Sequence, residues 1–305
     1  MSVYAPLIEQ VLSESQKVVL GKELQVKLSL AAFISGSHLL IEDIPGMGKT
    51  TLAKTLAKVL GLSYSRIQFT NDLLPSDILG VNFYNTKEAT FSFKKGAIFS
   101  QFLLADEINR ASSKTQSALL EAMEEKQISI DGATYKLPKP FFVIATKNPF
   151  EEVGTYELPS SQLDRFGVSI SLGYPSHDAE RELLTATKKI DTNSLKSLNE
   201  EESTTLQNAT DEVFVSEEIL TLVQEILAFT RESDLYVTGL STRAALNILK
   251  ISKAWATIEL RDYVVPNDIL EILPHIIKHR LKAKGSTKTP QEIRDEIVQN
   301  IHIDT

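Results

Sequence analysis

The sequence predicts an α/β protein in which a parallel sheet with helices on both faces is followed by a smaller all-helical domain. Two observations support this fold class. Strand-like and helix-like patterns alternate from about residue 37 to residue 172, as they do in parallel sheets whose crossover connections are helices. Beyond Tyr174-Pro175, apolar residues recur only at helical spacing. We therefore expect a first domain at residues 1–175 and a second at residues 176–305.

Three short apolar runs predict buried strands in the first domain. They are residues 38–41, 98–105 and 141–146. A helix is expected after the first strand, because Leu52, Leu56 and Val59 recur at helical spacing and Gly61 is suited to end it. A second helix is expected between the last two strands, at about residues 114–126.

The remaining segments predict a hairpin and three further helices. Asp131-Gly132 lies between two alternating segments and predicts a hairpin at about residues 127–138. A polar stretch at about residues 191–211 is expected to join the two domains. The apolar faces of the helices in the second domain are Ile219, Leu222, Ile226 and Phe229; Ala244, Ile248, Ile251, Trp255 and Ile258; and the run from Ile269 to Leu281.

The composition excludes several classes of protein. The 305 residues carry a net charge of −8, which argues against a protein whose main task is to bind nucleic acid phosphates. There is no cysteine, so disulfides and thiolate metal sites are excluded. No apolar run approaches the ~18 residues of a membrane span, and the N-terminus lacks the pattern of a signal peptide. We expect a cytoplasmic protein with no nucleic acid partner and no membrane span.

A phosphate-binding loop is predicted at Asp43–Thr50. This stretch, DIPGMGKT, fits the pattern G-x-x-x-x-G-K-[ST] except that Asp43 replaces the first glycine. It lies between a predicted strand and a predicted helix, where glycines let the backbone curl around phosphate oxygens. Asp tolerates unusual backbone angles, which makes the departure compatible with such a loop; an ordinary Gly/Pro turn is the alternative. The expected nucleotide-binding residues are Pro45, Gly46, Met47, Gly48, Lys49, Thr50 and Thr51.

Polar residues at the ends of the predicted strands complete a site for phosphoryl transfer. Lys49 is expected to reach the β- and γ-phosphates, and the Thr50 hydroxyl to bind Mg²⁺. Asp106 would hold the same Mg²⁺ through its water ligands, Glu107 would polarise the attacking water, and Asn148 could orient that water. The alternatives are a helix cap for the acidic pair and a local turn for the asparagine.

Two histidines have the spacing of a helical metal site. His275 and His279 are four residues apart, but the residues between them do not provide the acidic member of an H-E-x-x-H motif. We therefore expect a helix-surface or interface pair rather than a metal site.

Four motifs together resemble those of the MoxR family of AAA+ ATPases. They are the Asp43–Thr50 loop, ADEINRASSKTQSALLEAMEE, ATKNPFEEVGTYELPSSQLDRF and GLSTRA, which occur in this order over nearly the whole chain. The resemblance implies an AAA+ core with a helical lid, ATP and Mg²⁺ as cofactors, and a homo-oligomeric ring, usually a hexamer. It also implies chaperone-like work on a protein substrate, often one with a von Willebrand factor A domain or a metal cofactor. Residues 70–97 would form the insert typical of this clade.

The same resemblance assigns roles to two arginines. Arg165 in SQLDRF matches the arginine finger, which would reach the ATP of a neighbouring subunit and would point at solvent in a single chain. Arg243 in GLSTRA matches the second sensor, which would reach the ATP of its own chain. The alternatives are a surface salt bridge with Asp164 and a surface charge at a helix start. The chain departs from the usual residues of the family at Ala97, Lys147 and Thr242, none of which is a catalytic group.

The sequence therefore predicts a Mg²⁺-dependent ATPase that couples hydrolysis to the remodelling or maturation of a partner protein. Two alternatives stay open, namely the ATPase motor subunit of a metal chelatase and a scaffold that binds ATP with negligible turnover. A helicase or clamp loader is a third, and the negative net charge argues against it.

Overall fold

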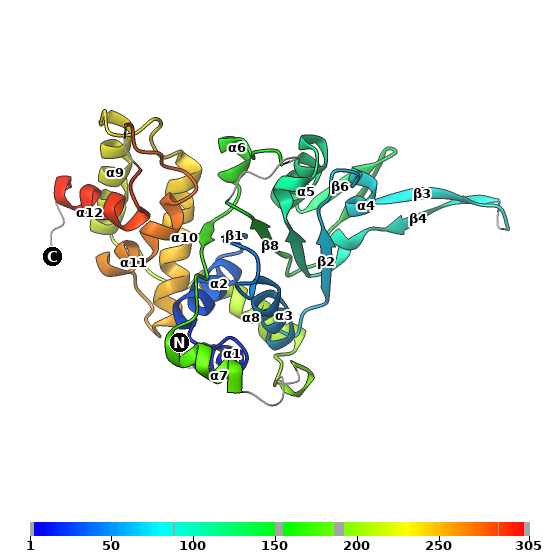
Figure 1. Cartoon of the computed structure of the whole chain (residues 1–305), viewed down its shortest axis with the longest axis horizontal. Coiled ribbons are helices and arrows are strands. Elements are labelled where there is room, and N and C mark those ends of the chain that lie inside the picture. Colours follow the sequence, from blue (N-terminus) through cyan, green and yellow to red (C-terminus); the bar gives the residue numbers. More distant parts are fainter. Residues whose placement is uncertain (1–2, 88, 150–154, 186–191, 286, 302–305) are drawn as a thin grey trace.

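The computed structural model of the chain describes residues 3–87, 89–149, 155–185, 192–285 and 287–301. It consists of a five-stranded sheet with helices on both faces, a group of lid helices at one end and a two-stranded arm at the other (Figure 1). The fold class expected from the sequence is confirmed. In the part of the chain that the structure describes, no helix is long and apolar enough to cross a membrane.

Strands and helices alternate through the first part of the chain, and helices dominate the rest. The first part contains α1 (Tyr4–Gln16), α2 (Glu23–Ile34), β1 (Leu39–Glu42), α3 (Lys49–Val59), β2 (Tyr64–Gln68), α4 (Pro75–Leu79), β3 (Gly80–Asn85), β4 (Thr90–Lys95), β5 (Phe102–Asp106), α5 (Ser113–Glu125), β6 (Gln127–Ile130), β7 (Ala133–Lys136), β8 (Phe142–Lys147), α6 (Ser160–Leu163) and β9 (Val168–Ile170). The second part contains α7 (His177–Thr185), α8 (Glu200–Asn208), α9 (Glu217–Glu232), α10 (Thr242–Ile258), α11 (Pro266–Ile277) and α12 (Pro290–Asn300).

All strands of the central sheet run parallel, in the order β2-β5-β8-β1-β9. Leu39 of β1 pairs with Ile144 of β8 and with Val168 of β9, so the three strands lie in close register. The sheet therefore has two distinct edges, which we name the carboxyl edge and the amino edge after the strand ends that meet there. In open parallel sheets, ligands bind beyond the carboxyl edge.

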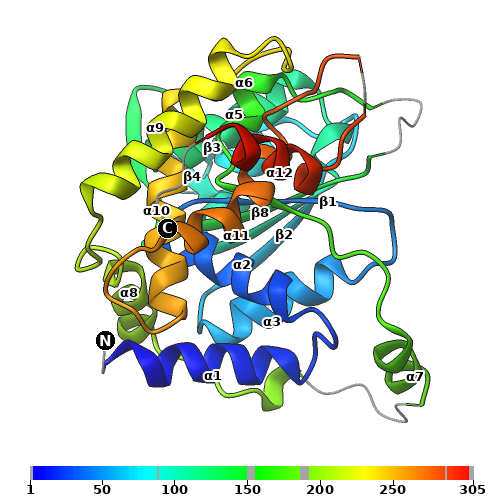
Figure 2. The same ribbon diagram turned by 90° about the vertical axis from the view of Figure 1, so that its left-hand side faces the viewer.

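Both faces of the sheet are buried. Leu39 and Ile41 of β1 pack in a first core with α1, α2, α3 and the lid helices, whereas Leu40 packs in a second core with α4 and α5. Burial on both faces explains why the strands read as continuous apolar runs. Figure 2 shows α1, α2 and α3 together on one side of the strands. Because the first core continues into the lid, the sheet and the lid share one hydrophobic interior.

The second strand of the expected three is shorter than residues 98–105. It begins at Phe102, because Ala97–Phe99 form a 3₁₀ turn that the Ser100 hydroxyl closes by donating to the carbonyl oxygen of Ala97 at 2.8 Å. Ile98 is nevertheless fully buried in the second core. The apolar run thus reflects burial rather than extended backbone.

The polar stretch expected at residues 191–211 is not an open linker. It contains α8, which begins with a capping box between Asn199 and Glu202 and buries Leu206 in the first core. The Ser203 hydroxyl donates to the carbonyl oxygen of Leu60, just after α3. This helix therefore packs under the sheet, against α1 and α2, rather than with the lid. Residues 186–191 lie outside the described residues.

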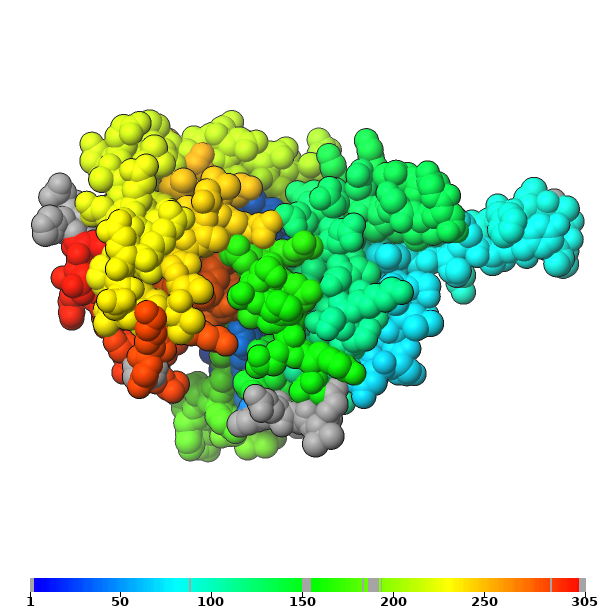
Figure 3. All heavy atoms as spheres, turned by 90° about the horizontal axis from the view of Figure 1, so that it is seen from above, coloured from blue at the N-terminus to red at the C-terminus, as the bar shows by residue number. Residues whose placement is uncertain are grey.

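Residues 70–97 include α4 and the antiparallel pair β3–β4, which projects from the body as an arm (Figures 1 and 3). A second hairpin, β6–β7, turns at Asp131-Gly132 and touches the base of the arm. Phe93 stacks on Tyr135 with ring centroids 4.2 Å apart, and the Asn82 amide donates to Asp131 at 2.7 Å. These contacts hold the base of the arm against the body.

Of the two settings expected for His275 and His279, the exposed helix surface is wrong, and the interface fits, because both lie where the lid packs on β9. Both face β9, where the His279 Nε2 atom lies 3.0 Å from the carbonyl oxygen of Phe166 and His275 bonds to the backbone of Ser169. Burial lowers the pKa of His275 to about 4 and holds the pKa of His279 well below its usual range. Among the described residues, no group of three or more His, Cys, Asp or Glu side chains could hold a metal ion.

His38, directly before β1, is a third buried histidine. Its Nε2 atom lies 3.3 Å from the carbonyl oxygen of Met123, and its Nδ1 atom accepts from the Val143 N–H at 3.1 Å. Burial lowers the pKa of His38 from 6.5 to about 4. The ring therefore stays neutral in the folded protein well below the pH at which it would be protonated in the unfolded chain.

The free energy of unfolding should fall as the pH drops from 6.5 toward 4, because over this range the unfolded chain binds a proton that folded His38 does not. His38 alone should contribute a loss of roughly 2 kcal/mol between pH 7 and pH 5. His38→Gln, whose amide can donate to Met123 and accept from Val143, should lose this part of the pH dependence. Urea unfolding of both proteins at the two pH values measures the difference, and equal losses would contradict the assignment.

Candidate active site

The loop between β1 and α3 has the backbone shape that phosphate binding requires. Gly46 and Gly48 both have a φ of +87°, a left-handed conformation that residues with a Cβ adopt only with strain. A Cβ built on either glycine would meet nothing within 4 Å, so open space borders the loop at both positions. Gly48 is also the N-cap of α3, so the positive end of this helix lies at the loop.

Lys49 begins α3, and its side chain turns back over the loop. The Nζ atom donates to the carbonyl oxygens of Asp43 and Ile44, the second at 3.2 Å. Burial lowers the pKa of Lys49, whereas the carboxylates of Asp43, Asp106 and Glu107 act in the opposite direction. These three carboxylates are therefore close enough to interact electrostatically with the ammonium group.

Asp43, which replaces the first glycine of the loop pattern, uses its carboxylate to tie the loop down. One oxygen accepts from the Ile44 N–H at 2.8 Å, and the other accepts from the Gly173 N–H at 2.7 Å. The φ of Asp43 is not positive, so tolerance of unusual backbone angles is the wrong explanation for this residue. Asp43 instead links the loop to the segment that follows β9.

Asp106 and Glu107 stand at the carboxyl edge, at the end of β5, and each is held by a residue of β2. The Asp106 carboxylate accepts from Arg66 at 2.6 Å and from the Thr146 hydroxyl at 2.6 Å. The Glu107 carboxylate accepts from the Gln68 amide at 2.7 Å. The pair is thus positioned by β2 and β8, the two strands that flank β5.

Glu107 has a strained backbone. Its φ of 55° and ψ of 51° are left-handed, which is uncommon for a residue other than glycine, and its N–H donates to the Thr146 hydroxyl at 2.8 Å. Strain of this kind concentrates at functional sites. The helix-cap alternative is not supported, because the Glu107 side chain caps no helix and Ser112 provides the cap of α5.

Asn148 follows β8 and lies at the same edge. Lys147, which precedes it, pairs with Glu42 at the end of β1, and its carbonyl oxygen accepts from the Asp43 N–H at 3.2 Å. The phosphate-binding loop, the acidic pair and Asn148 are therefore adjacent, as three neighbouring strands of a parallel sheet require.

A cavity of about 270 Å³ lies beside the loop. Its walls are mostly apolar and come from Met47 and Thr51, from Val18–Leu20 before α2, and from the segment after β9. The Lys22 Nζ atom joins the last two walls by donating to the carbonyl oxygens of Gly173 and Tyr174, the latter at 2.7 Å. An apolar cavity next to a phosphate site suits a flat aromatic base.

These residues fit ATP and Mg²⁺. The left-handed glycines border open space where phosphate oxygens could lie, and Lys49 supplies a partly buried cation. Thr50 and Asp106 would supply a hydroxyl and a carboxylate oxygen to Mg²⁺, which prefers oxygen ligands and usually binds through one or two protein side chains together with phosphates. Pro45 and Thr51 complete the loop around these groups.

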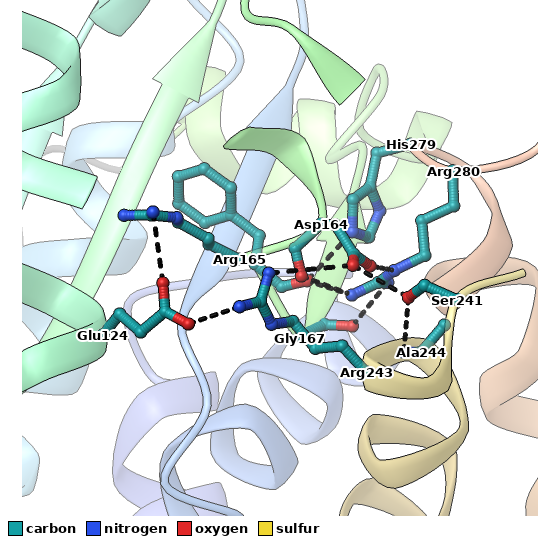
Figure 4. A network of polar contacts seen from close by, with 10 residues as sticks. Glu124, Asp164, Arg165, Gly167, Ser241, Arg243, Ala244, His279 and Arg280 are labelled. Carbon is teal, nitrogen blue, oxygen red and sulfur yellow. Dashed lines mark hydrogen bonds and ion pairs between the residues drawn. The ribbon is translucent and has the colours of Figure 1, made fainter. Parts of the chain in front are cut away.

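Arg165 and Arg243 lie at the opposite edge of the sheet from Lys49. Arg165 comes three residues before Val168, which pairs with the start of β1, and therefore stands at the amino edge. Glu124, near the end of α5, accepts from Arg165 at 3.2 Å and also from Arg243 (Figure 4). The two arginines thus meet on one carboxylate.

Both expectations for the orientation of these arginines need correction. Arg165 does not point at solvent, since it pairs with Glu124 and its side chain is only 28% exposed. Arg243 does not turn toward the loop of its own chain, because it pairs with Glu124. Glu124 lies at the amino edge, since the carbonyl oxygen of the preceding Met123 contacts His38 at the start of β1. The Asp164 carboxylate, the partner in the salt-bridge alternative for Arg165, accepts from Arg280 and Ser241 instead.

Comparisons with known proteins identify the family of the chain. Residues 38–168 match the model of the ATPase family associated with various cellular activities (AAA), and residues 228–301 match that of the AAA lid domain. Chaperone MoxR1 of Mycobacterium tuberculosis is 37% identical over 302 residues, which cover 96% of this chain and 80% of that protein. The chain belongs to the MoxR family of AAA+ ATPases.

Two further similar proteins match almost the whole chain. The Bacillus subtilis protein YeaC is 41% identical over 300 residues, which cover 97% of this chain and 93% of that protein. The crystal structure of a putative ATPase from Cytophaga hutchinsonii matches with a TM-score of 0.91 and 38% identity, and the match covers 99% of this chain and 96% of that one. The family expected from the motifs is confirmed.

The sequence did not reveal three residues that the structure places at the candidate site. Arg66 and Gln68 stand on β2, a strand whose only signal is the alternation of these polar residues with the buried Ile67. Lys22 precedes α2 and reaches the site only because the chain beyond β9 folds next to it. Residues 150–154 of the ATKNPFEEVGTYEL motif lie outside the described residues.

Asp43→Gly should lower the affinity for ATP by less than about tenfold, or ~1.4 kcal/mol, because its carboxylate bonds to backbone N–H groups rather than facing the ligand. Lys49→Ala should nearly abolish binding, since the triphosphate loses its main counter-charge. Asp43→Gly should also lower the free energy of unfolding by ~1–3 kcal/mol, because the Gly173 N–H loses its acceptor. Titration with a fluorescent nucleotide and urea unfolding measure these effects; equal losses of affinity would contradict the assignment.

Proposed function

We propose that this MoxR-family protein is a cytoplasmic, Mg²⁺-dependent enzyme that hydrolyses ATP to ADP and phosphate in a hexameric ring. Hydrolysis drives the chaperone-like remodelling or maturation of a partner protein. The relative named chaperone MoxR1 supports work of this kind. A protein with a von Willebrand factor A domain is the partner class that fits the family resemblance.

One observation carries the proposal: the phosphate-binding loop and the arginine pair of one chain lie at opposite edges of the same sheet. A single chain therefore has half of a hydrolytic site at each edge. Contact between the amino edge of one subunit and the carboxyl edge of the next completes each site, and contacts between two different surfaces generate rings. In such a ring, Arg165 and Arg243 both act on the ATP of the neighbour.

Catalysis in this arrangement is mostly positioning and charge stabilisation, as for phosphoryl transfer in general. Lys49 and the backbone of the loop bind the triphosphate. Glu107, after leaving Gln68, orients the attacking water and accepts its proton, and Asn148 holds the same water. Mg²⁺ supplies positive charge to the phosphates. The arginines of the next subunit offset the charge that develops on the transferred phosphoryl group.

The arm formed by β3–β4 is the surface that we assign to the partner protein. Tyr84 and Phe91 face each other across the arm with ring centroids 5.3 Å apart, and Phe91 is 75% exposed. Exposed apolar patches mark interaction sites, and aromatic residues are enriched at protein interfaces. The stacked rings of Phe93 and Tyr135 fix the base of the arm to the body. A partner protein bound to Tyr84 and Phe91 would therefore be mechanically connected to the body through the arm.

Glu107→Gln should keep ATP binding and lose turnover, because the amide preserves the shape of the side chain but cannot accept a proton from water. A steady-state phosphate-release assay, with nucleotide binding measured in parallel, tests this expectation. Turnover at the wild-type rate would make the acidic pair structural. A wild-type protein without turnover would favour the scaffold alternative.

Arg165→Ala should bind ATP normally and be almost inactive, since such an arginine typically contributes roughly 10³–10⁵ in rate. Mixing it with Lys49→Ala, which is inactive but retains Arg165, should recover some hydrolysis at sites formed by Lys49 of one chain and Arg165 of the next. Native mass spectrometry can verify that the rings are mixed. Absence of recovery in verified mixed rings, or full activity in a proven monomer, would exclude action on the neighbour.

A further inference from the structure

Among the described residues, Glu124 is the one whose side chain forms ion pairs with both arginines. It lies near the C-terminal end of α5, where one carboxylate oxygen accepts from Arg165 and the other from Arg243 (Figure 4). Arg165 belongs to the segment before β9, and Arg243 belongs to α10 of the lid. Three elements that are far apart in the sequence therefore meet at this carboxylate.

The backbone that carries Arg165 is fixed by the lid rather than by Glu124. Arg280, whose side chain is 4% exposed, donates to the Asp164 carboxylate at 2.7 Å and to the carbonyl oxygens of Phe166 and Gly167. The Ser241 hydroxyl donates to the same carboxylate at 2.8 Å. The Arg165 backbone is therefore held between buried contacts, whereas the direction of its side chain depends on Glu124.

The ion pairs of Glu124 lie in a partly exposed setting. The side chains of Glu124, Arg165 and Arg243 are 38%, 28% and 43% exposed, and ion pairs at such sites contribute little to the stability of a fold. They border a hollow of about 210 Å³ that Lys126 and Lys250 also line. The Glu124 carboxylate thus offsets the repulsion between the two guanidinium groups beside a hollow otherwise lined by cations, and the Asp164 carboxylate lies farther from Arg243, at 3.8 Å.

We propose that Glu124 is a positioning residue that holds Arg165 and Arg243 side by side, so that both guanidinium groups reach the phosphates of ATP on a neighbouring subunit together. This inference rests on the function proposed above. Without the Glu124 carboxylate, the two guanidinium groups repel each other and the Arg165 side chain changes its orientation, although the Arg165 backbone stays in place.

The first test compares Glu124→Gln with Glu125→Gln, a neutralisation of the adjacent exposed glutamate. At saturating ATP and ring-forming protein concentration, Glu124→Gln should lower kcat about 10- to 100-fold, because a displacement of about 1 Å at a reacting centre has effects of this size. Its own ATP affinity and its melting temperature should stay at the wild-type values. Glu125→Gln should match the wild type, and Glu124→Asp, which keeps the charge, should retain more activity than Glu124→Gln.

Mixed rings distinguish a positioning role toward the neighbour from a general structural role. Glu124→Gln subunits mixed with Lys49→Ala subunits should recover hydrolysis, because the Lys49→Ala chain presents an intact Glu124 and both arginines to the neighbouring loop. Absence of recovery in rings shown to be mixed would overturn the proposal. A kcat of Glu124→Gln equal to or above that of the wild type would also overturn it.

A measurement without turnover separates this inference from the proposed function. Phenylglyoxal, which modifies accessible arginines, should react faster with Arg165 and Arg243 in Glu124→Gln than in the wild type, as followed by peptide mass spectrometry. Equal rates would overturn the positioning role. If the wild type hydrolyses ATP, Arg165→Ala does not and Glu124→Gln is unaffected, the inference fails while the proposed function stands. If the wild type has no turnover, the proposed function fails and the modification rates alone decide the inference.

Discussion

Every strand of the central sheet runs in the same direction, and this constraint decides where each functional residue can stand. The residues that follow β1, β5 and β8 all emerge at the carboxyl edge, so the phosphate-binding loop, the Asp106-Glu107 pair and Asn148 are adjacent without any further device. The segment that enters β9 and the end of α5 must lie at the amino edge for the same reason. The separation of the loop and the arginine pair at two edges is thus a direct consequence of parallel topology.

At the amino edge, a buried arginine of the lid holds the segment that carries Arg165. Arg280 places its guanidinium against Asp164 and against the carbonyl oxygens of the segment before β9. Loss of one partner of such a buried pair typically costs about 3–5 kcal/mol, because the remaining charge stays buried without compensation. His279 reinforces the same segment through the carbonyl oxygen of Phe166. The lid therefore holds the arginine-bearing segment of its own chain, and the two should move together.

At the carboxyl edge, the acidic pair combines a strained backbone with side chains that hydrogen bonds hold in place. Glu107 has a left-handed backbone, and its side chain is held by Gln68, while Asp106 is paired with Arg66. Arg66 and Gln68 both belong to β2, which is an edge strand of the sheet. A change in the position of β2 would therefore reach both carboxylates at once. Asp43 connects the other side of the site to Gly173, so the loop and the chain beyond β9 are coupled as well.

Local patterns in the sequence were sufficient for much of the fold and of the loop. The strands β1 and β8 were predictable because burial on both faces leaves a continuous apolar run, and the helices α3 and α5 and the lid helices because burial of one helix face leaves a periodic one. β2 was not, since it is short and mostly polar, and α8 was not, since Leu206 is its one apolar residue. The 3₁₀ turn at Ala97–Phe99 was misread because burial alone does not reveal the backbone conformation.

The sequence by itself determined three strands of the sheet, the motif of the proposed phosphate-binding loop, the acidic pair and the family, because each is recorded in short motifs of neighbouring residues. Only the tertiary structure decided that Asp43 bonds to Gly173 and that Arg243 meets Arg165 on Glu124. Glu124 and Arg243 are 119 residues apart, and their contact follows from how the lid packs on the sheet. No local pattern records such packing, because it depends on buried surfaces contributed by the whole chain.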